Sequence, residues 1–269
     1  MIGAISGDVI GSVHEGTAAK AKDFPLFVPG STFTDDTVLT VAVANAIREG
    51  ADFGTSIRRW GRRYPDAGYG GWFYRWLFQD DAGPYNSFGN GSAMRVAAIG
   101  WAFDDLDVVL REATKSAEVT HNHPEGIRGA QAVAAAVLVA RLGQTKDQIA
   151  ALLSDRFGYD CSVRLDTLHR RGGFDVTCQG TVPAAAVAFL ESTDFEDAVR
   201  NAISLGGDAD TLACIAGAMA EAHYGRVPVA IQVEVLRRLD ETLRAEVIAF
   251  GKLFGVPLAD VPDLGEPAR

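Results

Sequence analysis

The sequence predicts an all-α protein, folded as one domain of many helices. Apolar residues recur at helical spacing along most of the chain, and polar residues fall on the other side of each segment. Only residues 174–178 alternate in the manner of a strand, and that segment is short and isolated. No long linker, low-complexity segment or fixed-period repeat divides the chain. We therefore expect one domain over residues 1–256 and a loosely packed C-terminal tail over residues 257–269.

A glycine-rich helix is expected at the N-terminus. Further helices are expected at residues 36–49, 92–103, 105–120, 125–142, 145–157, 182–192, 195–205, 210–224 and 228–254. These ranges are rich in Ala, Val and Leu. Several are bounded by a glycine that can end a helix or by a proline that can begin one, namely Gly50, Gly143 and Gly225, and Pro124, Pro183 and Pro228. In the first helix, Gly3, Gly7 and Gly11 leave a bare stripe, which we interpret as a surface for close helix packing.

Composition narrows the function. The chain has 269 residues with 25 Lys and Arg against 35 Asp and Glu, so its formal net charge is −10. Nucleic-acid and anionic-membrane surfaces need clustered positive charge, so we expect no stable binding to either. No run of about 18 apolar residues could span a membrane. The three cysteines are scattered and the first residues lack the charged region of a signal peptide, which predicts a cytoplasmic protein, expected to be a monomer.

Two short acidic segments carry most of the chemical information. Thr34, Asp35 and Asp36 directly precede one expected helix, and residues 206–211 directly precede another. One interpretation is plain helix capping, which favours Thr or Asp at these positions. Capping needs one side chain, however, and each segment offers two acids and a threonine. Two carboxylates held about 4 Å apart at an effective dielectric near 20 repel by roughly 4 kcal/mol, so a cation should offset them if the segments meet.

Aspartate and threonine oxygens are hard ligands, and neither His nor Cys lies beside them in the sequence. This composition favours Mg²⁺, with Mn²⁺ as the alternative, over zinc. The carboxylates of Asp35, Asp36, Asp208 and Asp210 would be neutralised by two divalent ions. A binuclear metal centre requires the two segments, which are about 170 residues apart, to come together in the fold. If they stay apart, helix capping is the interpretation that the residues favour.

In these motifs and their order, the chain resembles the ADP-ribosylglycohydrolase family, which includes the dinitrogenase reductase-activating glycohydrolase and the ADP-ribosyl-acceptor hydrolases. The resemblance covers about four fifths of the chain. Its motifs appear in the family's order: the first helix ending at Glu15, then Thr34-Asp35-Asp36, Gly89-Asn90-Gly91-Ser92-Ala93-Met94-Arg95, Thr120-His121, and Gly207-Asp208-Ala209-Asp210-Thr211. The family fold is an orthogonal bundle of helices around a binuclear metal centre, which agrees with the helical periodicity.

The resemblance implies a role for each matching residue. Two Mg²⁺ ions would be coordinated by Thr34, Asp35, Asp36, Asp208, Asp210 and Thr211. Glu15 matches an acid that some members place over the substrate, and we group it with Asp35 and Asp36 as catalytic. The loop along the ADP-ribose would comprise Asn90, Gly91, Ser92 and Met94, and His121 matches a histidine near the phosphates.

The activity implied is Mg²⁺-dependent release of ADP-ribose from an ADP-ribosylated protein or another modified acceptor, by cleavage at C1 of the distal ribose. The motifs do not distinguish an arginine, serine, O-acetyl or nucleic-acid acceptor. Two alternatives remain at this stage: a di-metal hydrolase of another ribosyl or phosphate compound, and a non-catalytic ADP-ribose-binding protein. All six metal-ligand positions are retained, which favours an enzyme.

Other candidates have plainer interpretations. The loop at residues 89–92 is not a Walker A motif, and as an ordinary turn it would use Ser92 as a helix N-cap. His121 and His123 suggest a zinc pair only weakly, and a histidine at a helix terminus is the simpler interpretation of His123. The aromatic run at residues 72–76 is expected mainly in the core, although one aromatic of this region could stack on adenine.

Overall fold

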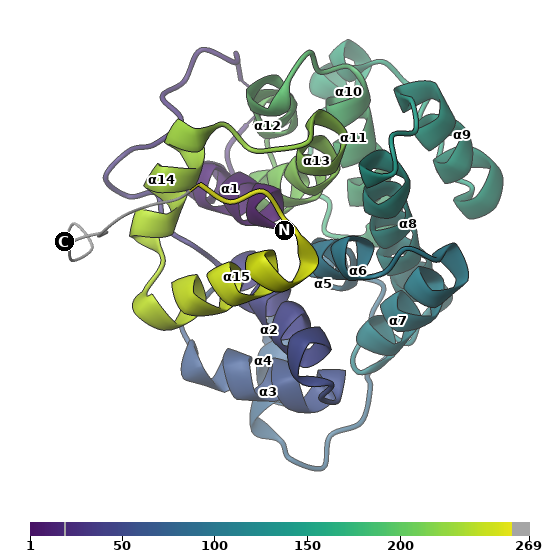
Figure 1. Cartoon of the computed structure of the whole chain (residues 1–269). Helices are drawn as coiled ribbons and strands as arrows, with labels where there is room; N and C mark the ends of the chain where they lie inside the picture. Colours follow the sequence, from purple (N-terminus) through teal and green to yellow (C-terminus); the bar gives the residue numbers. More distant parts are fainter. Residues whose placement is uncertain (19, 260–269) are drawn as a thin grey trace.

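The computed structural model describes residues 1–18 and 20–259 and confirms the all-α prediction (Figure 1). Within these residues, the only β pairing consists of two isolated bridges, Thr17 with Gly207 and Gly89 with Thr177. The helices are α1 (Ile2–Gly11), a 3-10 turn η1 (Ser12–His14), α2 (Asp35–Glu49), α3 (Phe53–Arg63), α4 (Gly71–Phe78), α5 (Gly91–Met94), α6 (Ala97–Ala102), α7 (Leu106–Glu118), α8 (Pro124–Arg141), α9 (Lys146–Phe157), α10 (Leu165–Arg171), α11 (Cys178–Leu190), α12 (Phe195–Ser204), α13 (Ala209–Tyr224), α14 (Val229–Arg238) and α15 (Glu241–Phe254).

Two predicted helices were wrong in length because each contains a break. The range 92–103 divides into α5 and α6, between Met94 and Ala97. The range 228–254 divides into α14 and α15, because Asp240 caps α15 by accepting hydrogen bonds from the backbone N–H groups of Thr242 and Leu243. An apolar pattern can continue through a change of helix direction, so periodicity alone did not show either break.

Three helices were not predicted at all: α3, α4 and α10. α3 is rich in arginine and buries only one narrow side, so it lacks the Ala- and Leu-rich composition of the predicted helices. Arg58 of α3 donates to the backbone oxygens of Trp76 and Gln79, and Arg62 donates to that of Leu77. These arginines therefore attach α3 to the end of α4 as well as facing solvent.

α1 lies at the centre of the bundle and runs along α13 (Figure 1). Every residue of α1 is buried, and its three glycines face the partner helix. A Cβ atom on Gly7 would lie 2.0 Å from the Ala213 carbonyl oxygen, and one on Gly217 of α13 would lie 2.3 Å from the Gly3 carbonyl oxygen. The glycine stripe is therefore a close helix-packing surface, as predicted.

α2 contacts α1 and also packs against α15 (Figure 1). Glu246 of α15 accepts hydrogen bonds from Asn45 over 3.0 Å and from Arg48 over 2.7 and 2.9 Å, and its side chain is almost wholly buried. A buried carboxylate needs such partners because burial otherwise disfavours its charge. These contacts fix the C-terminal half of α2, so the direction of its N-terminus is set by packing on both sides.

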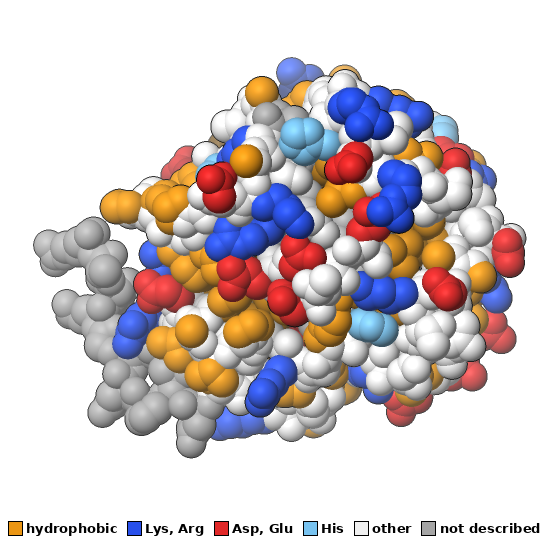
Figure 2. Space-filling view, turned by 90° about the horizontal axis from the view of Figure 1, so that it is seen from above, with side chains coloured by type: hydrophobic (Ala, Val, Ile, Leu, Met, Phe, Trp, Pro, Cys, Tyr) orange, Lys and Arg blue, Asp and Glu red, His pale blue; other side chains and the backbone are white. Residues whose placement is uncertain are grey.

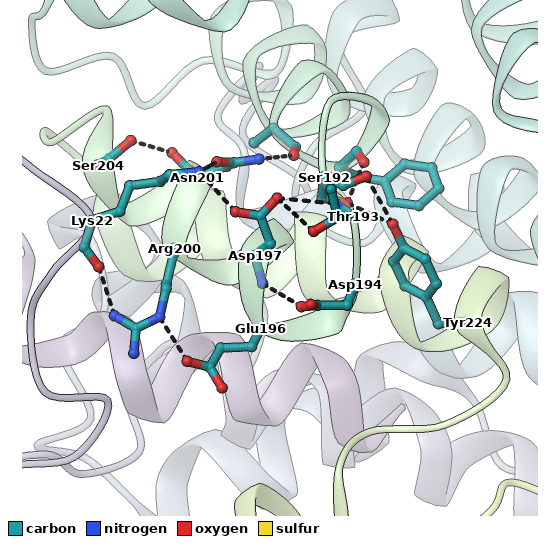
Figure 3. A network of polar contacts seen from close by, with 12 residues as sticks. Lys22, Ser192, Thr193, Asp194, Glu196, Asp197, Arg200, Asn201, Ser204 and Tyr224 are labelled. Carbon is teal, nitrogen blue, oxygen red and sulfur yellow. Dashed lines mark hydrogen bonds and ion pairs between the residues drawn. The ribbon is translucent and has the colours of Figure 1, made fainter.

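A network of polar contacts around α12 fastens an extended segment to the bundle (Figure 3). Lys22 Nζ donates to Asp197 and Asn201, each over 2.7 Å. The Arg200 guanidinium donates to the backbone oxygens of Lys22 and Phe24 over 2.6 and 2.7 Å. Residues 20–24 are thereby held against α12, the helix that directly precedes the start of α13.

The first part of the predicted tail is ordered against α14. Gln232 donates to the Pro257 carbonyl oxygen and accepts from the Ala259 N–H over 2.7 Å. The remainder of that predicted tail, residues 260–269, lies outside the described residues. Among the helices described, none combines the length and apolar character needed to cross a bilayer. On the face in Figure 2, acidic and basic side chains are interspersed.

The packing of α1 predicts the effect of Gly7→Ala. The added methyl group meets the backbone of α13, which cannot rotate away, so we expect the free energy of unfolding to fall by about 3 kcal/mol. Gly83→Ala is the matched control: no atom lies near its added Cβ, and the change should stay within about 0.5 kcal/mol. Urea unfolding followed by circular dichroism measures both. Equal stability of the two variants would contradict the close contact.

Candidate active site

Two helix N-termini that are far apart in the sequence meet in the bundle. α2 begins with Asp35 and Asp36. Asp208 is the N-cap of α13, and Asp210 and Thr211 lie in its first turn. The Thr211 hydroxyl donates a hydrogen bond to Asp36 Oδ2 over 3.2 Å, which joins the two segments directly. Asp36, Asp208 and Asp210 are buried, and Asp35 is half-buried. The structure therefore brings the two acidic segments together.

Helix capping accounts for only part of this arrangement. Thr34 is the N-cap of α2, and its hydroxyl accepts a hydrogen bond from the Asp36 N–H. Asp208 is the N-cap of α13 but makes no capping hydrogen bond with its side chain. The remaining carboxylates are thus available for another purpose.

Asp8 is a member of the cluster that sequence reasoning missed. It lies on α1, is fully buried, and accepts hydrogen bonds from the N–H groups of Thr34 and Thr37 over 3.0 and 3.1 Å. It also accepts from both threonine hydroxyls. Asp8 thus ties α1 to the first turn of α2. The signal in the sequence was an acid within an otherwise apolar helix, directly after Gly7.

The clustered carboxylates raise one another's pKa. Burial, followed by the charges of Asp8 and Asp208, raises the pKa of Asp35 to about 8. Burial and the Asp208 charge raise the pKa of Asp210 to about 9. The pKa of Asp36 lies well above its ordinary value for the same reasons, with Asp8 as its strongest neighbour. None of these acids forms an ion pair with Lys or Arg in the described part of the chain.

These residues fit divalent cations. Asp8, Asp36 and Asp210 each offer an oxygen within 4.8 Å of the others, and so do Glu15, Asp208 and Asp210. Asp36 Oδ1 is buried without a hydrogen-bond partner among the described residues. A set of carboxylate oxygens with an unpaired buried member suits hard ions such as Mg²⁺ or Mn²⁺.

Glu15 reaches this cluster from the end of η1. The residue as a whole is exposed, but its carboxylate is partly buried. This partial burial, followed by the charge of Asp208, raises the pKa of Glu15. The following backbone pairs with the start of α13: the Gly16 N–H donates to the Gly207 oxygen over 2.7 Å, and the Gly207 N–H donates to the Thr17 oxygen over 2.9 Å. This bridge, and not sequence proximity, sets Glu15 beside the aspartates.

The glycine-rich loop also contacts the cluster. Asn90 Nδ2 donates to Asp208 Oδ2 over 2.6 Å and to Thr181 over 3.0 Å, so this amide orients an acid of α13. Gly91 and Met94 line the neighbouring cavity. Asn90 was predicted to contact substrate; the structure also gives it a positioning role.

Ser92 differs from the prediction. Its hydroxyl is fully buried and donates to the Gly126 carbonyl oxygen over 2.7 Å, and the residue is absent from the lining of the cavity. The interpretation of Ser92 as a helix N-cap is wrong, because α5 begins at Gly91 and Asn90 occupies the N-cap position. Ser92 instead holds the loop against the start of α8.

The two neighbouring histidines have different positions. His121 is buried, lines the cavity, and lies with Nδ1 2.7 Å from the Thr120 hydroxyl. Burial and the charge of Arg95 place the pKa of His121 well below its ordinary value, so its imidazole is neutral. His123 is the N-cap of α8 and accepts from the Glu125 N–H, which confirms the helix-terminus interpretation.

A cavity of about 580 Å³ extends from the acidic cluster. The acids, including Glu15, Asp35 and Asp210, line one part of it. The remaining wall carries the glycine-rich loop, His121 and aromatic side chains, namely Trp72, Phe73, Tyr85 and Phe88. Its volume suits a ligand of nucleotide size.

The aromatic run at residues 72–76 divides between core and surface. Phe73 and Trp76 are buried in the core, whereas Trp72 is 69% exposed and Tyr74 is 45% exposed, so the expected core position holds for only two of the four aromatics. Trp72, Tyr85 and Phe88 lie in the cavity wall with accessible surface, so each remains available to stack on a base.

Comparison with known proteins gives a consistent result. The family model for ADP-ribosylglycohydrolase matches residues 1–260. ADP-ribosylhydrolase ARH3 of Homo sapiens is 27% identical, over 84% of this chain and 84% of that protein. ADP-ribosylarginine hydrolase Tri1 of Pseudomonas putida is 25% identical, over 84% of this chain and 69% of that protein.

A solved structure described as an ADP-ribosylglycohydrolase-related protein complex superimposes with a TM-score of 0.71 at 28% identity. The match covers 94% of this chain and 95% of that one. The bundle seen here, including the helices that carry the acids, is thus similar to that structure over almost its whole length.

The raised pKa values predict how pH changes stability when divalent ions are removed. The aspartates hold protons in the folded state up to about pH 8 to 9 but have an ordinary pKa of 3.8 when unfolded. Protonation of these aspartates therefore stabilises the folded protein. Their contribution to the free energy of unfolding is fully present below the unfolded pKa and is lost as pH rises through the folded pKa.

We therefore expect the Tm of EDTA-treated protein to fall between pH 5 and pH 9, and saturating Mg²⁺ to remove most of that dependence. Differential scanning fluorimetry measures it. The double variant Asp35→Asn/Asp210→Asn should show a flatter pH profile without metal. A metal-free Tm that rises with pH would contradict the electrostatic account.

Proposed function

The chain belongs to the ADP-ribosylglycohydrolase family, and from this premise we propose a Mg²⁺-dependent cleavage of the glycosidic bond at C1 of the distal ribose in an ADP-ribosylated acceptor. It is a hydrolase of the glycosidase type, and its family relatives release ADP-ribose. The observation that supports the proposal best is the meeting of α2 and α13, which places a group of buried carboxylates at one part of a nucleotide-sized cavity.

We assign the cation site to the oxygen-bearing side chains at the two helix N-termini. Thr34, Asp35 and Asp36 approach from α2, and the α13 side contributes Asp208, Asp210 and Thr211. The four carboxylates of this set balance the charge of two divalent ions. When bound, Mg²⁺ supplies Lewis acidity to the ribose hydroxyls and to an attacking water. Asp8 accepts four hydrogen bonds from Thr34 and Thr37 and so holds Thr34 in place, and its carboxylate also lies within reach of a cation held by Asp36 and Asp210.

The cavity orients the substrate. The distal ribose would lie against the acids, and the diphosphate would lie along Gly91, Met94 and His121. Cleavage at C1 develops positive charge on the ribose ring, and the nearby carboxylates stabilise it. Water is excluded from the buried side of this cluster, which strengthens that interaction.

Glu15 is the candidate for proton transfer. It is the exposed acid of the cluster, so it can reach both the attacking water and the acceptor group. Burial and the charge of Asp208 raise the pKa of Glu15 above its ordinary value, which favours proton exchange by this carboxyl. The carboxylates of α2 and α13 are more deeply placed and bind cations instead.

The acceptor is the open part of the proposal. Relatives include a protein named ADP-ribosylhydrolase and one named ADP-ribosylarginine hydrolase, so a modified protein side chain is the acceptor that we propose. The three cysteines are free thiols, which supports the further proposal that the protein acts in the cytoplasm. We propose that it acts as a monomer, since one chain supplies the whole acidic cluster.

A release assay tests the function. The purified chain is incubated with arginine-linked, serine-linked and nucleic-acid-linked ADP-ribose, with Mg²⁺ or with EDTA, and the products are separated by mass. We expect intact ADP-ribose from at least one linkage, only with Mg²⁺. Release of AMP instead would indicate pyrophosphate cleavage, and no release from any linkage, with ADP-ribose still bound, would indicate a binding protein.

Substitution of the acids tests the cation assignment. Asp36→Asn and Asp210→Asn should each lower kcat/KM by about 10³-fold or more, because a lost ligand weakens a charge that acts at the reacting centre. Asp155→Asn, an exposed acid of α9, is the control and should leave turnover unchanged. Calorimetry should show weakened Mg²⁺ binding for the first two only. Near-normal activity of both would sink the assignment.

Glu15→Gln separates proton transfer from cation binding. We expect kcat to fall by about 10²- to 10⁴-fold, as for loss of a general acid or base, while Mg²⁺ affinity changes little. The loss of the acidic limb from the pH–rate profile would mark Glu15 as the titrating group. A variant that loses Mg²⁺ binding as completely as Asp210→Asn would show instead that Glu15 is a ligand.

A further inference from the structure

Arg95 is a buried cation that the mechanism above does not use. Its side chain is fully buried in the cavity wall, and it forms no ion pair with a carboxylate in the described part of the chain. Its Nη2 donates to the Ser116 carbonyl oxygen and, over 3.2 Å, to the Thr120 hydroxyl. A buried guanidinium with so few acceptors is costly to keep, which indicates a specific role.

The bond from Arg95 decides the direction of the next hydrogen bond. A guanidinium can only donate, so the Thr120 oxygen accepts from it. The Thr120 hydroxyl is fully buried, and its only other partner among the described residues is His121 Nδ1, 2.7 Å away. The Thr120 proton is therefore paired only if it is donated to Nδ1. The reverse direction would leave a buried hydroxyl without an acceptor.

A neutral imidazole carries one proton, and if Nδ1 accepts, that proton is on Nε2. Nε2 has no hydrogen-bond partner within residues 1–18 and 20–259. It lies beside the glycine-rich loop: a Cβ atom on Gly91 would be 3.4 Å away and one on Gly89 would be 3.6 Å away. Glycine at these positions leaves the approach to Nε2 open from the cavity.

We propose that Arg95 and Thr120 are positioning residues that fix His121 in its Nε2–H tautomer, so that a neutral histidine presents a hydrogen-bond donor to an anionic phosphate oxygen of ADP-ribose. The ligand in this proposal rests on the proposed function, whereas the tautomer does not. Without the relay, part of the imidazole population would carry its proton on Nδ1 and present an Nε2 lone pair to the phosphate, which would repel it.

Nuclear magnetic resonance tests the tautomer without any ligand or metal. In protein labelled with ¹⁵N at histidine, His121 is assigned from the signal missing in His121→Asn. We expect one protonated and one unprotonated ring nitrogen, with the protonated nitrogen coupled to both ring carbon-bound protons, as Nε2 is. A wild-type spectrum with the proton on Nδ1 would overturn the proposal outright.

Substitutions of the relay give the second readout. Thr120→Val keeps the shape but removes the hydroxyl, and Arg95→Met keeps a long side chain without a donor. We expect both to give averaged nitrogen signals from a mixture of tautomers. Thr120→Ser retains the hydroxyl and should preserve the wild-type pattern. If Arg95→Met fails to fold, Thr120→Val still decides, and an unchanged tautomer in that variant would overturn the role of the relay.

ADP-ribose affinity connects the tautomer to the ligand. In calorimetry with saturating Mg²⁺, Thr120→Val should weaken binding by the factor that its measured tautomer ratio sets, about twofold for an equal mixture, and Thr120→Ser should leave the affinity unchanged. A mixed tautomer with unchanged affinity would overturn the contact with phosphate. Wild-type protein that does not bind ADP-ribose would contradict the proposed function, while the spectra would still decide whether the relay exists.

Discussion

The close approach of α1 to α13 is the constraint on which the acidic centre depends. The two backbones lie so near that a methyl group on Gly7 would reach within 2.0 Å of the Ala213 oxygen. Helices with larger side chains at the contact pack 8–10 Å apart, and glycine permits less. As a result, Asp8 within α1 and Glu15 just beyond it lie beside the first turn of α13, where Asp208 and Asp210 stand.

That placement creates an electrostatic problem, because several carboxylates share one buried region. For Asp8 the protein itself offsets the burial, with four hydrogen bonds from two threonines. Asp36 has an oxygen with no partner, and its neighbours raise its pKa. The fold therefore tolerates the cluster in protonated form or with bound cations. Repulsion between the ionised carboxylates destabilises the metal-free site. Binding of hard divalent ions relieves the same repulsion, which increases the affinity for them.

Much of the fold was open to prediction from local patterns, and the failures have identifiable causes. Long Ala-rich helices such as α8 and α13 were predicted to within one or two residues. α3 was missed because its arginines hide a narrow apolar side, and α10 because it is short and buries no residue. Asp8 was missed as a site residue because a single acid in an apolar helix has no local pattern that names its partners.

By itself, the sequence determined the chemistry at each helix start, because two aspartates close to a threonine at an N-terminus are recognised from neighbouring residues alone. It also determined the class of fold, since helical periodicity is local. Only the tertiary structure decided which oxygens share one site, since Asp36 and Thr211 are 175 positions apart and are joined by packing. The tertiary structure also decided that the Ser92 hydroxyl donates to the Gly126 carbonyl oxygen and that the Asn90 amide donates to Asp208. Side-chain direction follows from long-range contacts, and these depend on many weak interactions that no single segment encodes.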